Sequence, residues 1–176
     1  YVHRINRRLK RSMADGERAV AELQAGEEKY RLLTETMLDV VWTADAETLC
    51  LRYVSPSVER LLGYTPAELV GTSLLAAVDP AVIDDVKGLI RKGVDTFLSL
   101  SPGTPAFRTD ELHLPCKHGG GVWVEVLSTC CRNPRTGVVE LHGVARDISE
   151  RRATQARIAY MAQHDPLTEL PNRAVL

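Results

Sequence analysis

The sequence, 176 residues long, lacks the patterns that mark several large classes of protein. No run of about 18 apolar residues occurs, so no membrane span is predicted within it. Its net charge is −1, and this balance by itself favours neither nucleic acid nor a membrane as partner. The four cysteines form no C-x-x-C pair and no zinc spacing, which predicts free thiols in a reducing cytoplasm.

Catalytic patterns are also missing. Residues 1–150 contain no recognisable catalytic constellation, and no glycine-rich phosphate loop follows a predicted strand. Gly119-Gly120-Gly121 is predicted to be a hairpin turn. The five histidines are scattered, with no pair at the spacing of metal ligands. The sequence therefore predicts no catalytic residue and no metal site in this fragment, and we do not expect the fragment to be an enzyme.

What is present is a globular composition, with 44% apolar and 26% charged residues, enough for one domain with flanking helices. Residues 1–38 are predicted to form one long helix. Along it, mostly apolar residues recur at alternating spacings of four and three: Leu9, Met13, Gly16, Val20, Leu23, Glu27, Tyr30, Thr34 and Met37. This imperfect heptad seam favours a parallel dimer, with a single helix lying on the domain as the alternative.

The start of this helix is strongly basic. Five basic residues and no acid fall in the first eleven positions, namely Arg4, Arg7, Arg8, Lys10 and Arg11. No aromatic or other pattern supports a nucleic-acid patch there, so we expect no nucleic-acid partner. They are either the solvated start of a helix or the cytoplasmic flank of a membrane span upstream. We therefore expect a cytoplasmic domain, with an inner-membrane protein as one alternative for its parent.

The remaining pattern predicts an α+β fold. Two strands come first, several short helices and one longer helix follow, and three strands come last; the expected ranges are 40–44, 49–54, 55–78 (short helices), 80–94, 106–114, 121–131 and 138–148. This order predicts a five-stranded antiparallel sheet with the helices on one face. Apolar residues on both faces of the 121–131 strand indicate that the outer face is covered by the N-terminal helix or a partner subunit.

The last strand runs directly into a predicted helix at Gly143–Arg152, GVARDISERR. Asp147-Ile148-Ser149 ends the strand, and Ser149 is predicted to cap the helix. Glu150 lies in the first turn, where the helix dipole favours an acid. Because no loop separates the strand from the helix, we expect a displacement of the sheet to reach the helix.

This arrangement resembles a PAS (PAS/PAC) sensor domain. The resemblance covers about residues 30–150, and four segments carry it: VVWTAD (40–45), LRYVSPSVERLLGYTPAELVG (51–71), VWVEV (122–126) and GVARDISERR (143–152). It implies the PAS fold, with a long N-terminal helix and a C-terminal connector helix. In that family the Asp-Ile-Thr-like motif ties the last strand to the output helix, which assigns signal transmission to Asp147 and Ser149.

The final segment, HDPLTELPNR (164–173), resembles the entry of a GGDEF domain, the fold of bacterial diguanylate cyclases. It departs from the common pattern in having Glu169 where glycine is usual. The resemblance implies that the chain ends just inside a domain that condenses two GTP into cyclic di-GMP. It also implies that Asn172 contacts the guanine base of GTP. The metal-binding acids of such a domain would follow Leu176.

PAS domains often hold a ligand between the sheet and the long helix, so the resemblance also predicts a pocket. Its expected wall is apolar and comprises Trp42, Ile83, Leu89, Ile90, Leu112, Leu114, Val124 and Val126. A small hydrophobic or mixed ligand fits such a wall best. A fully packed core without ligand is the alternative.

The cofactors used by PAS proteins were compared with the residues present. Haem-binding members carry a histidine on the long helix, and residues 80–94 contain none, so haem would need His113 or another substitute. Light-sensing flavin members carry a reactive cysteine after the second short helix, where this chain reads TSLLAAVDP. We therefore expect no cofactor, and non-covalent flavin stays open. Mg²⁺ and GTP are expected only in the downstream cyclase domain.

Together these predictions describe a dimeric, signal-sensing PAS domain that controls a C-terminal diguanylate cyclase. The expected organisation is an N-terminal helix (1–38), the PAS domain (39–149), a connector helix (150–163) and the start of the GGDEF domain (164–176). Two alternatives stay open, a constitutive dimerisation module without ligand and a redox or gas sensor with flavin or haem.

Overall fold

A computed structural model describes residues 37–163 apart from 102, 103 and 105, together with positions 20, 21, 24 and 26. The chain divides into two compact units, Tyr1–Met37 and Leu38–Leu176, and the second contains the sheet. The predicted coiled coil of residues 1–38 therefore lies almost wholly outside the described residues. So does the whole segment 164–176 with Asn172. No helix among the described residues is long and apolar enough to cross a membrane.

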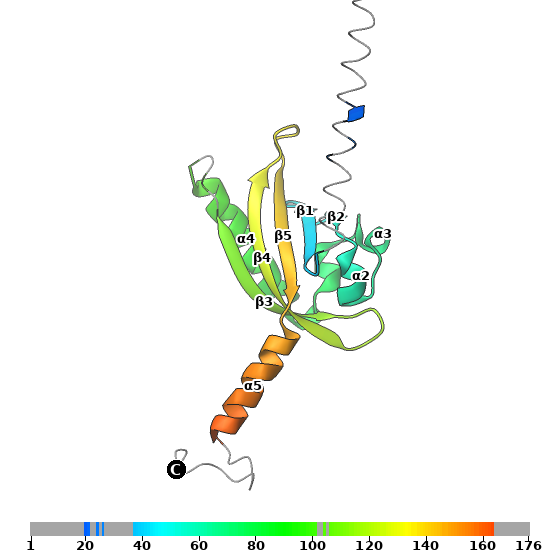
Figure 1. Ribbon diagram of the computed structural model, residues 1–176. Coiled ribbons are helices and arrows are strands. Elements are labelled where there is room, and N and C mark those ends of the chain that lie inside the picture. The colour runs from blue at the N-terminus through cyan, green and yellow to red at the C-terminus, as the bar shows by residue number, and fades with distance from the viewer. Residues whose placement is uncertain are drawn as a thin grey trace, which may run out of the picture. The chain divides into compact units, whose positions relative to one another are not determined.

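The sheet is the central element (Figure 1). Five strands lie in the order β2-β1-β5-β4-β3, and every neighbouring pair is antiparallel. The α+β prediction and the strand order along the chain are confirmed. The strands are β1 (Val40–Asp45), β2 (Leu51–Val54), β3 (Phe107–Pro115), β4 (Gly121–Arg132) and β5 (Val139–Asp147).

Short helices connect β2 to β3, as predicted. They are α2 (Ser57–Leu62), α3 (Pro66–Leu69), the 3-10 turns η1 (Leu74–Ala77) and η2 (Pro80–Val82), and the longer helix α4 (Ile83–Ser99). Helix α5 (Ser149–Gln163) follows β5 without a loop residue beyond Ile148.

The predicted boundaries of β2 and α4 are wrong by two residues or more, and α4 begins at Ile83 because Pro80–Val82 form the 3-10 turn η2. Strand β2 begins at Leu51 because Leu49 adopts a left-handed conformation (φ +57°) in the hairpin turn, which a strand cannot contain. Helix α4 extends to Ser99, five residues past the predicted end. Its last turns are largely exposed, so their apolar spacing gave little signal.

The core lies between one face of the sheet and the helices. It is formed by inward-facing strand residues such as Val40, Trp42 and Val124, together with Val58 and Leu62 of α2. Helix α4 contributes less than its sequence predicts, since only Val86 among its residues is buried. Leu89 and Ile90 of α4 are half-exposed because they border the cavity described below.

Candidate functional site: the cavity and the output junction

A cavity of about 450 Å³ lies between α4 and the inner face of the sheet. All five strands contribute to one wall, and the stretch of α4 from Val86 to Thr96 forms another. Its apolar lining includes Val40, Trp42, Leu51, Val54, Leu89, Ile90, Leu112, Leu114, Val126, Leu141 and Ala145. A space of this size falls in the range of small-molecule sites. The core is therefore not fully packed.

Six of the eight residues predicted for the pocket wall line this cavity, namely Trp42, Leu89, Ile90, Leu112, Leu114 and Val126. The prediction is wrong for Val124 and Ile83. Val124 is fully enclosed by core side chains (0% exposed), so it faces packed atoms and no open volume. Ile83 is the first residue of α4, outside the stretch of that helix that borders the cavity.

Trp42 is held in the cavity wall by a glycine on the neighbouring strand. Trp42 pairs with Gly143 in the β1–β5 register. A Cβ atom on Gly143 would collide with the indole ring, so only glycine lets the ring lie this close to β5. The ring is 8% exposed. The sequence offered both residues but gave no sign that they meet.

One part of the cavity is polar. Arg108 donates two hydrogen bonds to Asp110, from Nε at 2.7 Å and from Nη2 at 2.8 Å, and Nη1 donates to the Leu89 carbonyl at 2.9 Å. The pair is two residues apart on β3, so both side chains face inward. Lys92, Thr96, Ser128 and Thr129 also border the cavity. This lining suits a ligand with an apolar body and one polar group. These polar residues were not predicted from the sequence, although the period-two spacing of Arg108 and Asp110 on a predicted strand indicates that the two side chains share a face.

The residues present do not fit a haem ligand set. The described helix α4 contains no histidine. His113 projects from the opposite face of β3, where its ring lies 5.3 Å from that of Trp123, so it does not reach the cavity. Cys130 lines the cavity, and burial, with the neighbouring Cys131, raises the pKa of its thiol.

The output junction lies at the end of β5. Asp147 accepts a hydrogen bond at Oδ1 from the Ser149 N–H (2.8 Å), so its side chain ties the strand to the first helical residue. Ser149 was predicted to cap the helix through its hydroxyl. Instead its Oγ accepts from the Trp123 N–H at 3.4 Å, and the Ile148 N–H donates to the Trp123 carbonyl at 2.9 Å. The two residues predicted for transmission thus lie together beside Trp123 on β4.

Two arginines that the sequence analysis did not single out attach α5 to the outer face of the sheet. Glu111 and Glu125 lie directly opposite each other on β3 and β4. Arg151 bridges them, with Nη2 2.8 Å from the first carboxylate and 3.1 Å from the second. Arg152 lies 2.7 Å from Glu111 and places its guanidinium 4.0 Å from the centroid of the Trp123 ring. The first turn of α5 is therefore held by charge and by a cation–π contact.

The strand that enters the domain meets the strand that leaves it at this same end. Val40 pairs with Ala145 in the β1–β5 register. Just before β1, Asp39 accepts hydrogen bonds from Nε and Nη2 of Arg146, at distances of 2.7–3.1 Å. This hydrogen bonding, with the Asp39 charge, raises the pKa of Arg146. The residues at which the chain enters and leaves the sheet are thus linked directly.

Comparison with known proteins identifies the fold family. Residues 28–148 match the family model of the PAS fold. An uncharacterized protein, y4lL, of Sinorhizobium fredii is 32% identical over 134 residues, which are 76% of this chain. The chain spans only 15% of the length of that relative.

Two similar solved structures show the same fold at low sequence identity. An RNA-binding light-oxygen-voltage receptor superposes with a TM-score of 0.59 at 20% identity, over 77% of this chain and 37% of the receptor. The N-terminal domain of a diguanylate cyclase with a PAS/PAC sensor, from Marinobacter aquaeolei, gives 0.51 at 20% identity, over 65% of this chain and 98% of that one. With the family match over most of its length, this chain belongs to the PAS family.

Proposed function

We propose that this chain is a signal-sensing PAS domain that works as a dimer and controls a diguanylate cyclase domain following it. The observation that carries the sensing role is the cavity of about 450 Å³ on the inner face of a sheet whose last strand continues into α5. A bound ligand would have an apolar body, with one polar group near Arg108 and Asp110. The same proposal places the domain in the cytoplasm, and in one alternative a membrane span precedes it in the parent protein.

A displacement at the cavity can reach α5 through residues that are neighbours in one strand, because their side chains lie on opposite faces of the sheet. Leu112 and Val126 line the cavity, and their chain neighbours Glu111 and Glu125 face the other way and hold Arg151. A ligand that shifts β3 against β4 would change the distance between these carboxylates. The helix would then move or loosen at its first turn, with Asp147 and Ser149 acting as the hinge.

Two observations support the cyclase as output. Residues 164–173 resemble the entry of a GGDEF domain, with Asn172 as the guanine contact. A solved structure with the same fold is the sensor domain of a diguanylate cyclase. Such a cyclase would bind Mg²⁺ and GTP in the downstream domain, and α5 would set how two such domains meet. Beyond its attached first turn, α5 exposes apolar side chains suited to a helical partner, such as Ile158 and Met161.

The test of the output uses the chain extended by the coding sequence that follows Leu176, with cyclic di-GMP formed from GTP and Mg²⁺ as the readout. Substituting Asp147→Ala should change the rate about fivefold or more, the usual range of allosteric coupling. Arg157→Ala, on the exposed part of α5, is the matched control and should leave the rate unchanged. Absence of cyclic di-GMP from the unaltered protein would remove the cyclase. Equal rates for both variants would remove Asp147 from transmission.

The test of the sensing role is separate. The purified chain is denatured, and whatever it releases is identified by mass spectrometry after its absorbance spectrum is recorded. A colourless small molecule with an apolar body supports the proposal. A flavin spectrum would favour the redox alternative, to which the light-oxygen-voltage receptor of similar fold lends support. Release of nothing, with output unaffected by cavity substitutions, would favour a constitutive dimerisation module.

A further inference from the structure

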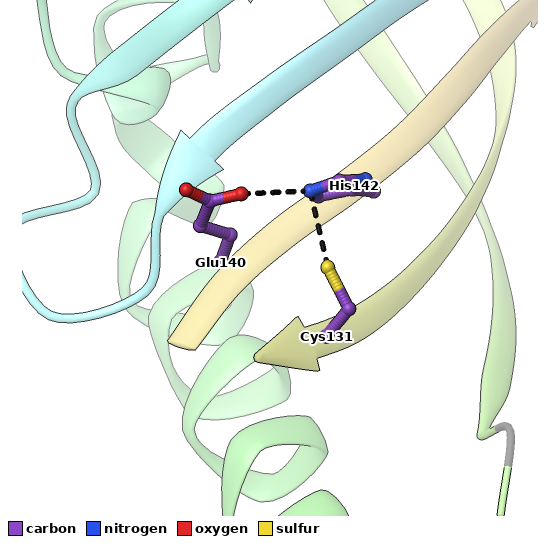
Figure 2. Close-up of side chains that lie close together, drawn as sticks. All are labelled: Cys131, Glu140 and His142. Carbon is purple, nitrogen blue, oxygen red and sulfur yellow. Dashed lines mark hydrogen bonds and ion pairs between the residues drawn. The ribbon is translucent and has the colours of Figure 1, made fainter. Parts of the chain in front are cut away.

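Three potential metal ligands meet on the outer face of the sheet, away from the cavity (Figure 2). Cys131 Sγ lies 3.1 Å from Nε2 of His142, and the same nitrogen lies 3.1 Å from Oε2 of Glu140. All three ligand atoms fall within 4.8 Å of one another, and all three residues are partly buried.

The register of the sheet explains how they meet. Cys131 on β4 is the direct cross-strand partner of Glu140 on β5, and His142 lies two residues further along the same face of β5. The neighbouring residues Cys130 and Leu141 point into the cavity on the other side. No sequence spacing reveals this cluster, since its members come from two strands paired across a hairpin.

The hydrogen-bonding capacity of the histidine does not account for both contacts. An imidazole nitrogen carries either one proton or one lone pair. If Nε2 carries the proton, a single hydrogen cannot point along both lines, to the sulfur and to the carboxylate. If Nε2 carries the lone pair, it faces the lone pairs of the Glu140 oxygen. A cation among the three atoms would be bonded by all of them.

We propose that Cys131, Glu140 and His142 bind a zinc-type divalent transition-metal ion. Thiolate, imidazole and carboxylate are the ligand types that Zn²⁺ prefers, with bonds of about 2.3, 2.0 and 2.1 Å. In a tetrahedron these bonds place ligand atoms about 3.3–3.6 Å apart, so the two 3.1 Å separations need to open only slightly. Hard cations such as Mg²⁺ and Ca²⁺ would not choose a thiol and an imidazole. The fourth position would be open to water or to another ligand.

The carboxylate is already oriented for this role. Asn133 Nδ2 donates to Oε1 of Glu140 at 2.8 Å, which leaves Oε2 directed at the histidine. Asn133 is itself fixed, because its Oδ1 accepts from the N–H groups of Arg135 and Thr136 in the turn. Hydrogen bonds that orient a ligating carboxylate are a usual feature of metal sites.

The test titrates the full chain, free of any affinity tag, with Zn²⁺ by calorimetry and with Co²⁺ by absorbance. We expect one ion per chain and a thiolate-to-cobalt charge-transfer band. Cys131→Ser should abolish that band, and Cys131→Ser and Glu140→Gln should each weaken Zn²⁺ binding about tenfold or more. Cys130→Ser removes the adjacent thiol on the opposite face and is the matched control. It should bind as the unaltered chain does.

Three results would overturn the proposal. One is the absence of heat and of the cobalt band in the unaltered chain. Another is a band that survives Cys131→Ser but disappears in Cys130→Ser. The third is Zn²⁺ affinity unchanged by Glu140→Gln. Circular dichroism of each variant shows whether it folds. If Cys131→Ser does not fold, the proposal is judged from the Zn²⁺ affinity of Glu140→Gln and from the cobalt band of the unaltered chain.

Discussion

Gly143 is the residue whose size most directly shapes the cavity wall. Because a Cβ atom there would collide with the Trp42 ring, Gly143→Ala must displace the ring or the strand. We expect a loss of about 1–3 kcal/mol in the free energy of unfolding, the usual cost of overpacking. Urea denaturation followed by tryptophan fluorescence measures it.

The matched control is Gly88→Ala in α4. Nothing lies within 4 Å of the position a Cβ would take there, and alanine is the better helix former. This variant should therefore be more stable, by about 0.5–1 kcal/mol. A Gly143→Ala protein as stable as the unaltered chain would show that Trp42 does not lie against Gly143.

Glu68 makes the domain sensitive to acid. Its Oε2 accepts from the N–H and hydroxyl of Thr65, and its Oε1 is paired with Lys117, which lies 49 residues further along the chain. The Lys117 hydrogen bond is the main cause that lowers the pKa of Glu68 to about 2. Since the folded pKa lies below the ordinary value of 4.5, the stabilisation is fully present above pH 4.5 and is lost as the pH falls to about 2.

This titration is measurable by NMR of the Glu68 carboxyl carbon. Lys117→Met should move the midpoint up towards the ordinary value. In denaturation experiments, the difference between the unaltered chain and Glu68→Gln should shrink as the pH falls through that window. A midpoint near 4.5 in the unaltered chain would contradict the ion pair. Thr65 and Glu68 form a capping box at the start of α3, which is a local sequence pattern, whereas the lysine partner comes from a distant turn that local spacing cannot reach.

At the scale of elements, the strands follow from the sequence because alternation and turn residues are local signals. Helix α4 shows the limit of that reasoning. Its apolar residues predict a buried side, yet Leu89 and Ile90 border a cavity and stay partly exposed. Whether a helix packs fully against a sheet depends on side chains from several strands at once, which no single segment of the sequence encodes. Six of eight wall residues were therefore predictable, and the open volume between them was not.

The attachment of α5 to the sheet could not be predicted from the sequence for a similar reason. In the sequence, Arg151 and Arg152 simply follow Glu150 in the first turn of the predicted connector helix, with no sign of a partner. In the structure Ile148 is buried in the domain (2% exposed), and the two arginines contact acids on β3 and β4. Glu111 and Glu125 face each other across these strands, and like charges in that position repel. The need for a bridging cation is visible only once the register is known.

Removing the guanidinium of Arg151 should loosen the first turn of α5. Arg151→Ala leaves the two carboxylates unbridged, and these groups are partly exposed, so we expect a loss of about 1 kcal/mol. Amide exchange at Arg152, whose N–H donates to the Ile148 carbonyl, should accelerate about fivefold. Hydrogen exchange followed by NMR measures it.

Arg157→Ala is the control for this experiment. Arg157 forms no ion pair with another described residue, unlike Arg151 and Arg152. Removing the Arg157 side chain should therefore leave exchange at Arg152 unchanged. The double variant Arg151→Ala with Glu125→Gln should recover part of the protection, because it relieves the repulsion. Equal exchange in both single variants would show that Arg151 does not hold the helix.

At the scale of the whole molecule, the sheet has two faces with different roles. The inner face borders the cavity, and the outer face carries the α5 attachment, the proposed metal site and exposed apolar side chains. Trp123 and Leu127 on β4 are 37% and 43% exposed. The proposal of a dimer through the N-terminal helix and this face predicts that such side chains are covered in the assembly.

That prediction can be tested with one charge placed on each side of the domain. Leu127→Lys puts an ammonium group on the outer face, where burial against a second copy would leave it unpaired. Its dimer dissociation constant should rise about tenfold or more, equivalent to about 1.4 kcal/mol. Val70→Lys, at a side chain of matching exposure (45%) beside α3, should leave it unchanged. Sedimentation equilibrium of the full chain decides between a dimer that uses the sheet and one held by the N-terminal helix alone. In the second case both variants would dissociate like the unaltered chain, and a signal could reach the partner only through the flanking helices.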